Sequence, residues 1–427
     1  MKTEFEFKKG DKIVIIGGGF AGLQLARALK NTEFQVIIID KQNHHQFQPL
    51  FYQIASSRLE PASISFPYRK IFHGIKNVEF RMAEVLSINP EINTIITTTA
   101  NIIYDHLVIA SGCKTNFFGN EQLSKHAMSM KTTQDAIKIR NKILLNFEEE
   151  VFAKEKDRLA LSNIIIAGAG PTGVELSGAF AELKNTVLPK DYPTLDFNHL
   201  NIILVEGSKH TLNNMSEESK LTSQKYLEKM GVQVKAGVLI NSYDGENAIL
   251  STGEIIPTRI LIWAAGVTGN IISGLKTEEI IKNRYIVDRY NKLIQHNNIY
   301  ALGDVAYMAT PLYPNAHPQV ANVAINQAKM LAKNMKRSLK EQPLTEYEYK
   351  DLGMMATIGK NKAVVDLPFL KFHGALAWYF WMFLHLMLIL SVRNKLIIFI
   401  NWAWSYFTKD TSLRLILNTE PDKEIIR

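Results

Sequence analysis

Short runs of consecutive apolar residues, many of them β-branched, mark the strands that this sequence predicts. Such runs occupy residues 13–16, 164–167 and 202–205, and they are typical of strands buried on both faces of a parallel sheet. A glycine-rich turn follows each of the first two runs, and a segment with helical spacing of apolar residues follows each turn. This alternation of strand and helix predicts an α/β fold.

The first of these units carries a Gly-x-Gly-x-x-Gly motif at residues 17–22 and an acid, Asp40, at the end of its second strand. In such a motif Gly17 makes a tight turn, Gly19 lets the backbone approach a pyrophosphate, and Gly22 permits close packing of the helix on the strand. The helix N-terminus then faces the phosphates with its free N–H groups. Asp40 stands where a carboxylate can accept hydrogen bonds from ribose hydroxyls.

The same plan recurs in residues 164–206, with Gly168, Gly170 and Gly173 in the turn and Glu206 after the second strand. The carboxylate of Glu206 would repel a 2′-phosphate, so this unit favours NADH over NADPH. A single glycine motif is weak evidence, because ordinary glycine-rich turns also match it. Two copies, each with its strands, helix and acid, predict two dinucleotide sites.

Both units close with a strand that runs into small residues, at residues 105–112 and 259–266. Such a turn lets the chain pass near a bound dinucleotide, although a tight strand exit explains it equally well. A later strand, within residues 299–304, ends in Gly-Asp. It would return the chain to the first unit and place Asp304 beside the first ligand. The second Rossmann-like unit is therefore expected to be inserted in the first.

Composition limits the chemistry further. The 427 residues are 46% apolar and include one cysteine, Cys113, which excludes an intrachain disulfide framework, a cysteine-based zinc site and a dithiol redox pair. The net charge of +8 suits a phosphate-rich ligand or an anionic membrane surface, but such an excess is common. Residues 1–11 lack the apolar segment of a secretory signal. We expect a chain that stays on the cytosolic side, with no metal site and no nucleic-acid partner.

Two apolar runs, residues 375–392 and 396–407, lie near the C-terminus. The first barely reaches the length of a membrane span, and the second is too short. Arg393 and Lys395 separate the runs, and four of the five tryptophans fall within them: Trp378, Trp381, Trp402 and Trp404. Because tryptophan and basic residues favour the lipid headgroup level, we expect two amphipathic helices that dock on a membrane. A buried helical hairpin, a dimer face and a true span are the alternatives.

Together these motifs resemble the two-dinucleotide-binding flavoproteins, and among them type II NADH dehydrogenase, the single-subunit NADH:quinone oxidoreductase. The narrower resemblance rests on residues 47–55 (FQPLFYQIA), residues 168–176 (GAGPTGVEL) and the C-terminal runs. It implies FAD on the first unit, NADH on the second, and hydride transfer to the flavin followed by reduction of a membrane quinone, of unspecified type, without proton pumping. It also implies a peripheral respiratory-chain enzyme, a homodimer on the cytoplasmic face of the cell inner membrane.

The resemblance also implies site residues. Those expected to hold FAD are Gly17, Gly19, Phe20, Ala21, Gly22, Asp40, Lys41, Ala110, Gly112, Gly303 and Asp304. Those expected to hold NADH are Gly168, Gly170, Pro171, Thr172, Gly173, Glu206, Ala265 and Gly266. The expected catalytic residues, near the quinone, are Glu175, Asn322 and Asn326. For Glu175 an equal alternative is an acid in a first helical turn, stabilised by the helix dipole.

The sequence departs from the family at the quinone site. Asn322 and Asn326 stand where relatives have glutamines, and each asparagine is shorter by about 1.5 Å, one carbon–carbon bond. Leu352 stands where many relatives have lysine, which would stabilise a reduced flavin. These departures leave two alternatives. The protein is a divergent flavoprotein with impaired quinone reduction, or one that binds flavin without turnover.

Two further alternatives concern the acceptor. A soluble FAD/NAD(P)H-dependent reductase of a protein such as ferredoxin would not need the tryptophan-rich C-terminal runs. Sulfide:quinone oxidoreductase has a similar architecture but needs more than one redox cysteine in the chain.

The expected domain organisation follows the order of the motifs. The FAD domain would comprise residues 1–125 and 281–364, interrupted by a linker helix at residues 126–160 and the NADH domain at residues 161–280. Residues 365–427 would form the membrane-anchoring helices.

Overall fold

The computed structural model describes residues 7–411 and 413–417. Within these residues the chain divides into two compact units. Unit 1 comprises residues 7–46, 66–114 and 267–350, and unit 2 comprises residues 47–65, 115–266, 351–411 and 413–417. Unit 1 is thus interrupted by the main part of unit 2, as expected for an insertion. The domain boundaries expected from the sequence stay a prediction.

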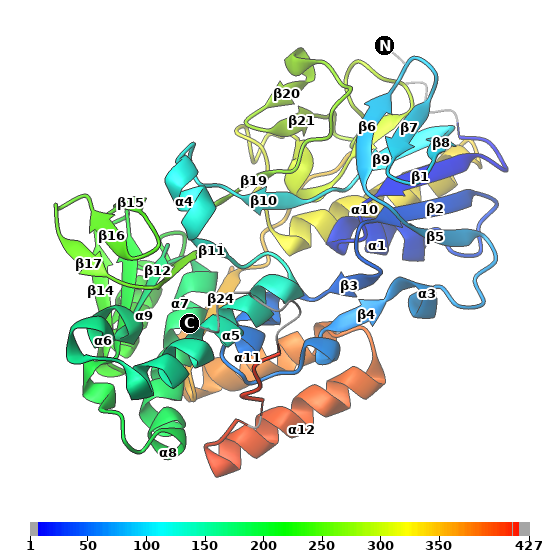
Figure 1. Ribbon diagram of the computed structural model, residues 1–427. Coiled ribbons are helices and arrows are strands. Elements are labelled where there is room, and N and C mark those ends of the chain that lie inside the picture. The colour runs from blue at the N-terminus through cyan, green and yellow to red at the C-terminus, as the bar shows by residue number, and fades with distance from the viewer. Residues whose placement is uncertain (1–6, 412, 418–427) are drawn as a thin grey trace. The chain divides into compact units, whose positions relative to one another are not determined.

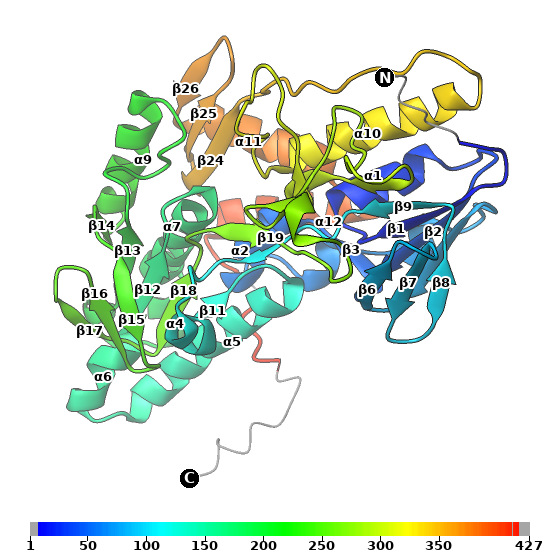
Figure 2. The same ribbon diagram turned by 90° about the horizontal axis from the view of Figure 1, so that it is seen from above.

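Unit 1 is built on a five-stranded parallel sheet in the order β22-β9-β1-β2-β5. Its strands are β1 (Lys12–Ile16), β2 (Gln35–Asp40), β5 (Val78–Met82), β9 (His106–Ile109) and β22 (Ile299–Ala301). Figures 1 and 2 show helices α1 (Phe20–Ala28) and α10 (Ala321–Ser338) side by side along this sheet. The apolar runs fill the interior because the other face is covered as well, by the sheet β6-β7-β8.

The remaining elements of unit 1 are short strands and turns around this core. They are β3 (His44–Gln46), β4 (Ser65–Pro67), α3 (Tyr68–Ile71), β6 (Val85–Asn89), β7 (Thr94–Thr97), β8 (Asn101–Ile103), β10 (Cys113–Thr115), β19 (Val267–Gly269), η4 (Thr277–Glu279), β20 (Ile280–Ile281), β21 (Arg284–Ile286), η5 (Gly303–Val305) and β23 (Ala306–Tyr307). The first residue of β4 and the last residue of β10 belong to unit 2.

Unit 2 repeats the plan with a five-stranded parallel sheet in the order β11-β18-β12-β13-β14. Its strands are β11 (Met128–Ser129), β12 (Asn163–Ala167), β13 (Asn201–Glu206), β14 (Val232–Ala236) and β18 (Ile260–Trp263). Helix α7 (Pro171–Thr186) follows β12 directly, as α1 follows β1. The repeat inferred from the two glycine motifs is therefore a repeat of structure.

Helices and a small sheet surround this core. They are η1 (Gln48–Leu50), α2 (Phe51–Ala55), η2 (Pro61–Ser63), α4 (Glu121–His126), α5 (Thr133–Phe152), α6 (Glu155–Ser162), α8 (Leu188–Asp191), η3 (Phe197–His199), α9 (Glu217–Lys229), β15 (Ile240–Tyr243), β16 (Asn247–Leu250) and β17 (Ile255–Pro257). The stretch expected as one linker helix thus holds two helices, because the backbone is extended at Ala153 and Lys154.

The C-terminal part of unit 2 is a three-stranded antiparallel sheet followed by two helices. These are β24 (Met354–Gly359), β25 (Lys362–Asp366), β26 (Lys371–His373), α11 (Ala375–Leu388) and α12 (Val392–Thr408). Side-chain amide bonds from Asn394 to the carbonyls of Ala62 and Ser63, at 3.0 and 2.8 Å, tie α12 to η2. Among the described residues, no helix has the length and apolarity needed to cross a membrane.

Candidate functional site

The residues expected to bind the first dinucleotide gather at the carboxyl ends of four adjacent strands of unit 1. β1 leads to Gly17, Gly19 and the first turn of α1 with Phe20, Ala21 and Gly22; β2 ends at Asp40, before Lys41; β9 leads to Ala110 and Gly112; and β22 leads to Gly303 and Asp304 in η5. In parallel α/β sheets this is the edge at which nucleotides bind.

The three motif glycines of unit 1 differ in what surrounds them. Gly17 has φ +96°, and a Cβ on it would collide with the carbonyl of Ala110. A Cβ on Gly22 would collide with the carbonyl oxygen of Gly17, whereas a Cβ on Gly19 would meet nothing within 4 Å. The fold itself therefore needs Gly17 and Gly22, while Gly19 leaves an open backbone that a pyrophosphate can approach. These residues fit FAD.

Asp40 is tied to the glycine loop. Its Oδ2 accepts a hydrogen bond from Gly18 N at 2.7 Å, and its Oδ1 accepts one from Gln42 N at 2.7 Å. Burial raises the pKa of Asp40. A carboxylate has about four lone-pair positions, so the two that remain can accept ribose hydroxyls.

Unit 2 has the same loop geometry. Gly168 has φ +97°, and a Cβ on it would collide with the backbone of Ala264 and Ala265. A Cβ on Gly173 would collide with the carbonyl oxygen of Gly168, whereas Gly170 has open space. Pro171 and Thr172 lie in the first turn of α7, and Ala265 and Gly266 follow β18. These residues fit NADH.

Glu206 takes the place that Asp40 has in unit 1. Its Oε2 accepts a hydrogen bond from Ala169 N at 2.6 Å, and its Oε1 accepts bonds from the backbone N and the hydroxyl of Ser208, both at 2.7 Å. The acid is thus held against the glycine loop, where a ribose hydroxyl would reach it.

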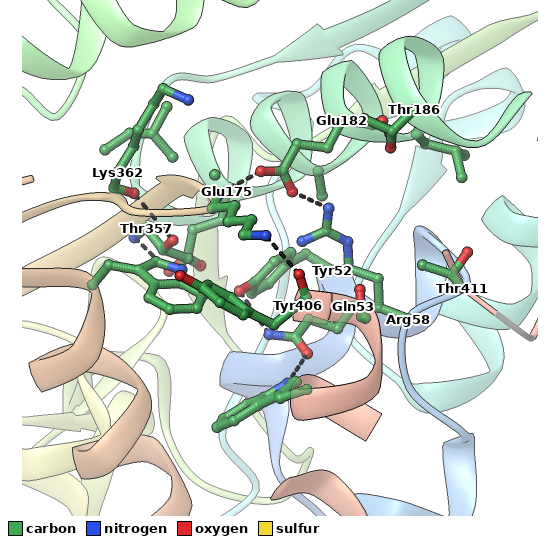
Figure 3. A pocket seen from close by; sticks show the side chains of 18 of the residues that line it. Tyr52, Gln53, Arg58, Glu175, Glu182, Thr186, Thr357, Lys362, Tyr406 and Thr411 are labelled. Atoms are coloured by element: carbon green, nitrogen blue, oxygen red, sulfur yellow. Dashed lines mark hydrogen bonds and ion pairs between the residues drawn. The ribbon is translucent and has the colours of Figure 1, made fainter. Parts of the chain in front are cut away.

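A cavity of about 320 Å³ lies within unit 2, between α2, α7, β24, α11 and α12 (Figure 3). Aromatic side chains from the C-terminal helices form much of its wall, including Trp378, Trp381 and Trp402. The sequence interpretation placed these tryptophans at lipid headgroups, but Trp381 is only 1% exposed. Its indole stacks on His385 with ring centroids 3.9 Å apart. The cavity therefore uses part of the aromatic surface that was expected to face lipid.

Glu175 lines this cavity as the fifth residue of α7 and is 9% exposed. It lies beyond the first turn, so the helix-dipole explanation for this acid is wrong. Thr357 N donates a long hydrogen bond, 3.5 Å, to Glu175 Oε1. The indole Nε1 of Trp381 is near enough to lower the pKa slightly, although its geometry falls short of a hydrogen bond. Burial outweighs both effects and raises the pKa of Glu175 to about 8. The carboxyl group is therefore mostly protonated at neutral pH.

Three other charged groups of the cavity, Arg58, Glu182 and Lys360, have partners within it. Arg58 forms an ion pair with Glu182, and Lys360 N also donates to that carboxylate. Lys360 Nζ donates to the carbonyl of Tyr406 at 2.6 Å and lies 3.8 Å from the centroid of its ring. The lining thus offers an apolar slot with a neutral acid, Glu175, in its wall.

Asn322 and Asn326 belong to α10 in unit 1, and neither lines this cavity. Asn322 is exposed and Asn326 half-buried, and within the described chain neither side chain forms a hydrogen bond. The neighbouring Gln327 instead accepts a bond from Gly303 N at 2.7 Å and so fixes the Gly-Asp turn. The catalytic role of the two asparagines stays a prediction.

The cavity also holds polar residues that the sequence interpretation missed. Tyr52 and Gln53 lie in α2, within the stretch that carried the family resemblance, and Trp402 reaches Gln53 from α12. A polar pair inside an otherwise apolar helix was the available signal.

The comparisons with known proteins agree with this geometry. Residues 11–328 match the pyridine nucleotide-disulphide oxidoreductase family, and residues 352–409 match the NDH2 C-terminal domain. The type II NADH:quinone oxidoreductase NdhA of Mycobacterium tuberculosis is 31% identical over 414 residues, which cover 92% of this chain and 87% of the relative. The chain belongs to the type II NADH:quinone oxidoreductase family.

Two further proteins are similar to this chain, one in sequence and one in fold. The type II NADH:quinone oxidoreductase of Staphylococcus aureus is 28% identical over 366 residues, covering 83% of this chain and 89% of that protein. The structure of NDH2 from Plasmodium falciparum in complex with NADH has a TM-score of 0.86 at 20% identity, with 96% of this chain and 100% of that chain covered. The predicted type II family and the predicted fold class, two Rossmann-like domains with a C-terminal helical segment, are confirmed.

Proposed function

We propose that this protein is an FAD-dependent NADH:quinone oxidoreductase, which passes hydride from NADH to the flavin and then two electrons to a membrane quinone. Family membership supports the reaction as a whole. The cavity around Glu175 is the observation that supports its second step, the reduction of the quinone. A quinone ring needs an apolar slot, and its reduction to the quinol consumes two protons. An aromatic cavity with a carboxyl group of pKa about 8 offers the slot and one of these protons, and the hydride taken from NADH would bring the other.

The residues of each unit would have a distinct role in binding and proton transfer. In unit 1 the open backbone at Gly19 and the carboxylate of Asp40 would bind the pyrophosphate and ribose of FAD, which supplies the redox chemistry when bound. In unit 2 Gly170 and Glu206 would do the same for NADH. Glu175, protonated at neutral pH, would give a proton to the reduced quinone at the cavity. Asn322 and Asn326 do not line this cavity, and their catalytic role remains a separate prediction.

Rapid mixing tests this proposal. Anaerobic NADH should bleach the yellow flavin of the purified protein, and a short-chain ubiquinone or menadione should restore it. A flavin that stays oxidised with NADH would favour a binding protein without turnover. A flavin that NADH reduces, and that ferricyanide but no quinone reoxidises, would favour a reductase of a protein acceptor.

Nucleotide preference should depend on the charge of Glu206. Glu206→Gln keeps one accepting oxygen but removes the charge that repels a 2′-phosphate, so the ratio of kcat/KM for NADH over NADPH should fall about 10-fold or more. Steady-state ferricyanide reduction with each nucleotide measures this ratio. Glu228→Gln, on the exposed face of α9, is the matched control. An unchanged ratio would show that Glu206 does not select the nucleotide.

We further propose that α11 and α12 attach the protein to a lipid surface. The protein would be a homodimer, and the surface would be the cytoplasmic face of the cell inner membrane. Each helix exposes a stripe of large apolar side chains at helical spacing: Leu376, Tyr379, Phe383 and Met387 on α11, and Val392, Leu396, Phe399 and Phe407 on α12. Exposed Arg393 and Lys409 border the stripe of α12 and suit anionic headgroups.

Vesicle sedimentation tests the docking. The double variant Phe399→Glu/Phe407→Glu should release most of the protein from anionic vesicles while ferricyanide reduction by NADH stays at the wild-type rate. Retention on vesicles together with a dissociated dimer in gel filtration would assign these stripes to the dimer face instead.

A further inference from the structure

A chain of two hydrogen bonds leads from α12 into the wall of the cavity. Trp402 Nε1 donates to Gln53 Oε1 at 2.7 Å, and Gln53 Nε2 donates to the hydroxyl oxygen of Tyr52 at 2.9 Å (Figure 3). All three residues line the cavity. Tyr52 is 4% exposed and Gln53 is 5% exposed, so neither side chain is oriented by bulk water.

The chemistry of these groups fixes the direction of both bonds. An indole N–H can only donate, so the Gln53 amide must turn its oxygen toward Trp402. The amide nitrogen then faces Tyr52 and donates to it. The Tyr52 oxygen is thereby an acceptor, and its own proton must point elsewhere.

That proton has no acceptor among the residues that the structure describes. The only hydrogen bond of the Tyr52 hydroxyl in this part of the chain is the one it accepts from Gln53. Burial and the nearby Glu175 raise the pKa of Tyr52 well above 10, so the phenol keeps its proton at neutral pH. A buried hydroxyl without an acceptor is costly, and an acceptor inside the cavity would remove that cost.

We propose that the Tyr52 hydroxyl donates a hydrogen bond to a carbonyl oxygen of the quinone, and that Gln53 and Trp402 are positioning residues that aim it. This inference rests on the proposed function, because it takes the quinone as the occupant of this cavity. A quinone carbonyl is an acceptor without protons of its own, which is the partner that this hydroxyl lacks. The bond strengthens as the carbonyl oxygen gains negative charge during reduction, so it favours the transition state over the bound quinone.

Separate half-reactions of the flavin-loaded enzyme test the inference. Tyr52→Phe removes one oxygen atom and should slow flavin reoxidation by a short-chain quinone about 10- to 100-fold, mainly in kcat. NADH should still reduce the flavin at the wild-type rate, and ferricyanide, which has no carbonyl oxygen, should reoxidise it as before. Tyr226→Phe, which removes a phenol oxygen on α9 outside the cavity, is the matched control.

Trp402→Phe tests the positioning chain. Without the indole donor the Gln53 amide can flip, and its oxygen can then accept the Tyr52 proton, so quinone reoxidation should fall about 3- to 10-fold with ferricyanide unaffected. Reoxidation of Tyr52→Phe by quinone at the wild-type rate would overturn the inference. If Tyr52→Phe fails to hold flavin, Trp402→Phe decides alone, and a wild-type quinone rate again overturns it. A wild-type enzyme whose flavin no quinone reoxidises would instead refute the proposed function.

Discussion

Glu175→Gln is expected to slow quinone reduction about 100-fold or more while leaving flavin reduction by NADH at the wild-type rate. Glutamine keeps the size of the side chain but has no acidic proton, and positioned proton donors typically contribute 10²- to 10⁴-fold. The pKa of Glu175 is raised to about 8, so the protonated form is present below that pH and is lost above it. The wild-type rate of flavin reoxidation by quinone should therefore fall as the pH rises through about 8, and the variant should lack this step.

The same carboxyl group links pH to stability. Its pKa in the folded protein lies above the ordinary value of 4.5, so the unfolded chain releases this proton first as the pH rises. The contribution of Glu175 to the free energy of unfolding is therefore fully present below about pH 4.5 and is lost between there and about pH 8, by on the order of a few kcal/mol. Above pH 8 Glu175→Gln should be more stable than the wild type.

Two outcomes would contradict this assignment of Glu175. One is quinone reduction by Glu175→Gln at the wild-type rate across pH 6 to 10. The other is equal pH dependence of thermal unfolding in the two proteins. Glu228→Gln is again the control, because that acid is exposed on α9 and its loss should change neither profile.

The nucleotide loops could be predicted from the sequence because their determinants are local. Each is a buried strand, a glycine turn and a helix start within about ten residues, and the acid follows at the end of the next strand. Gly17 and Gly168 show why the pattern is so constrained, since both have positive φ and touch the backbone of a neighbouring strand exit. The sequence does not show that backbone contact, but it does show the glycine that the contact requires.

The cavity could not be predicted in the same way, because its wall is assembled from elements that lie far apart in the sequence. Tyr52 comes from α2, Glu175 from α7, Thr357 from β24 and Trp402 from α12. No local spacing connects these residues, and the apolar character of the C-terminal runs suited lipid contact and burial equally. Only the packing of α11 shows that Trp381 is an interior residue.

Gly19→Ala and Gly22→Ala are expected to fail in different ways, although both lie in one motif. A Cβ on Gly22 would collide with the carbonyl oxygen of Gly17, so the apoprotein should lose about 1–3 kcal/mol of stability or more. A Cβ on Gly19 meets no protein atom within 4 Å, so the apoprotein should unfold at the wild-type temperature. It should nevertheless stay colourless after reconstitution with FAD, because the methyl group blocks the approach of the pyrophosphate.

The glycine loop of unit 2 allows the same two kinds of substitution, and these serve as an internal control for the loop of unit 1. Gly170 has open space and Gly173 faces the carbonyl oxygen of Gly168, so Gly170→Ala should fold, stay yellow and resist reduction by NADH while dithionite still bleaches it. Gly173→Ala should instead lower the stability of the protein, as Gly22→Ala does in unit 1. Wild-type flavin content in Gly19→Ala, or wild-type reduction by NADH in Gly170→Ala, would mean that the pyrophosphate does not approach that loop at its second glycine. Because the two substitutions are chemically identical and lie in equivalent turns, a flavin defect in one and an NADH defect in the other would assign each dinucleotide to its own unit.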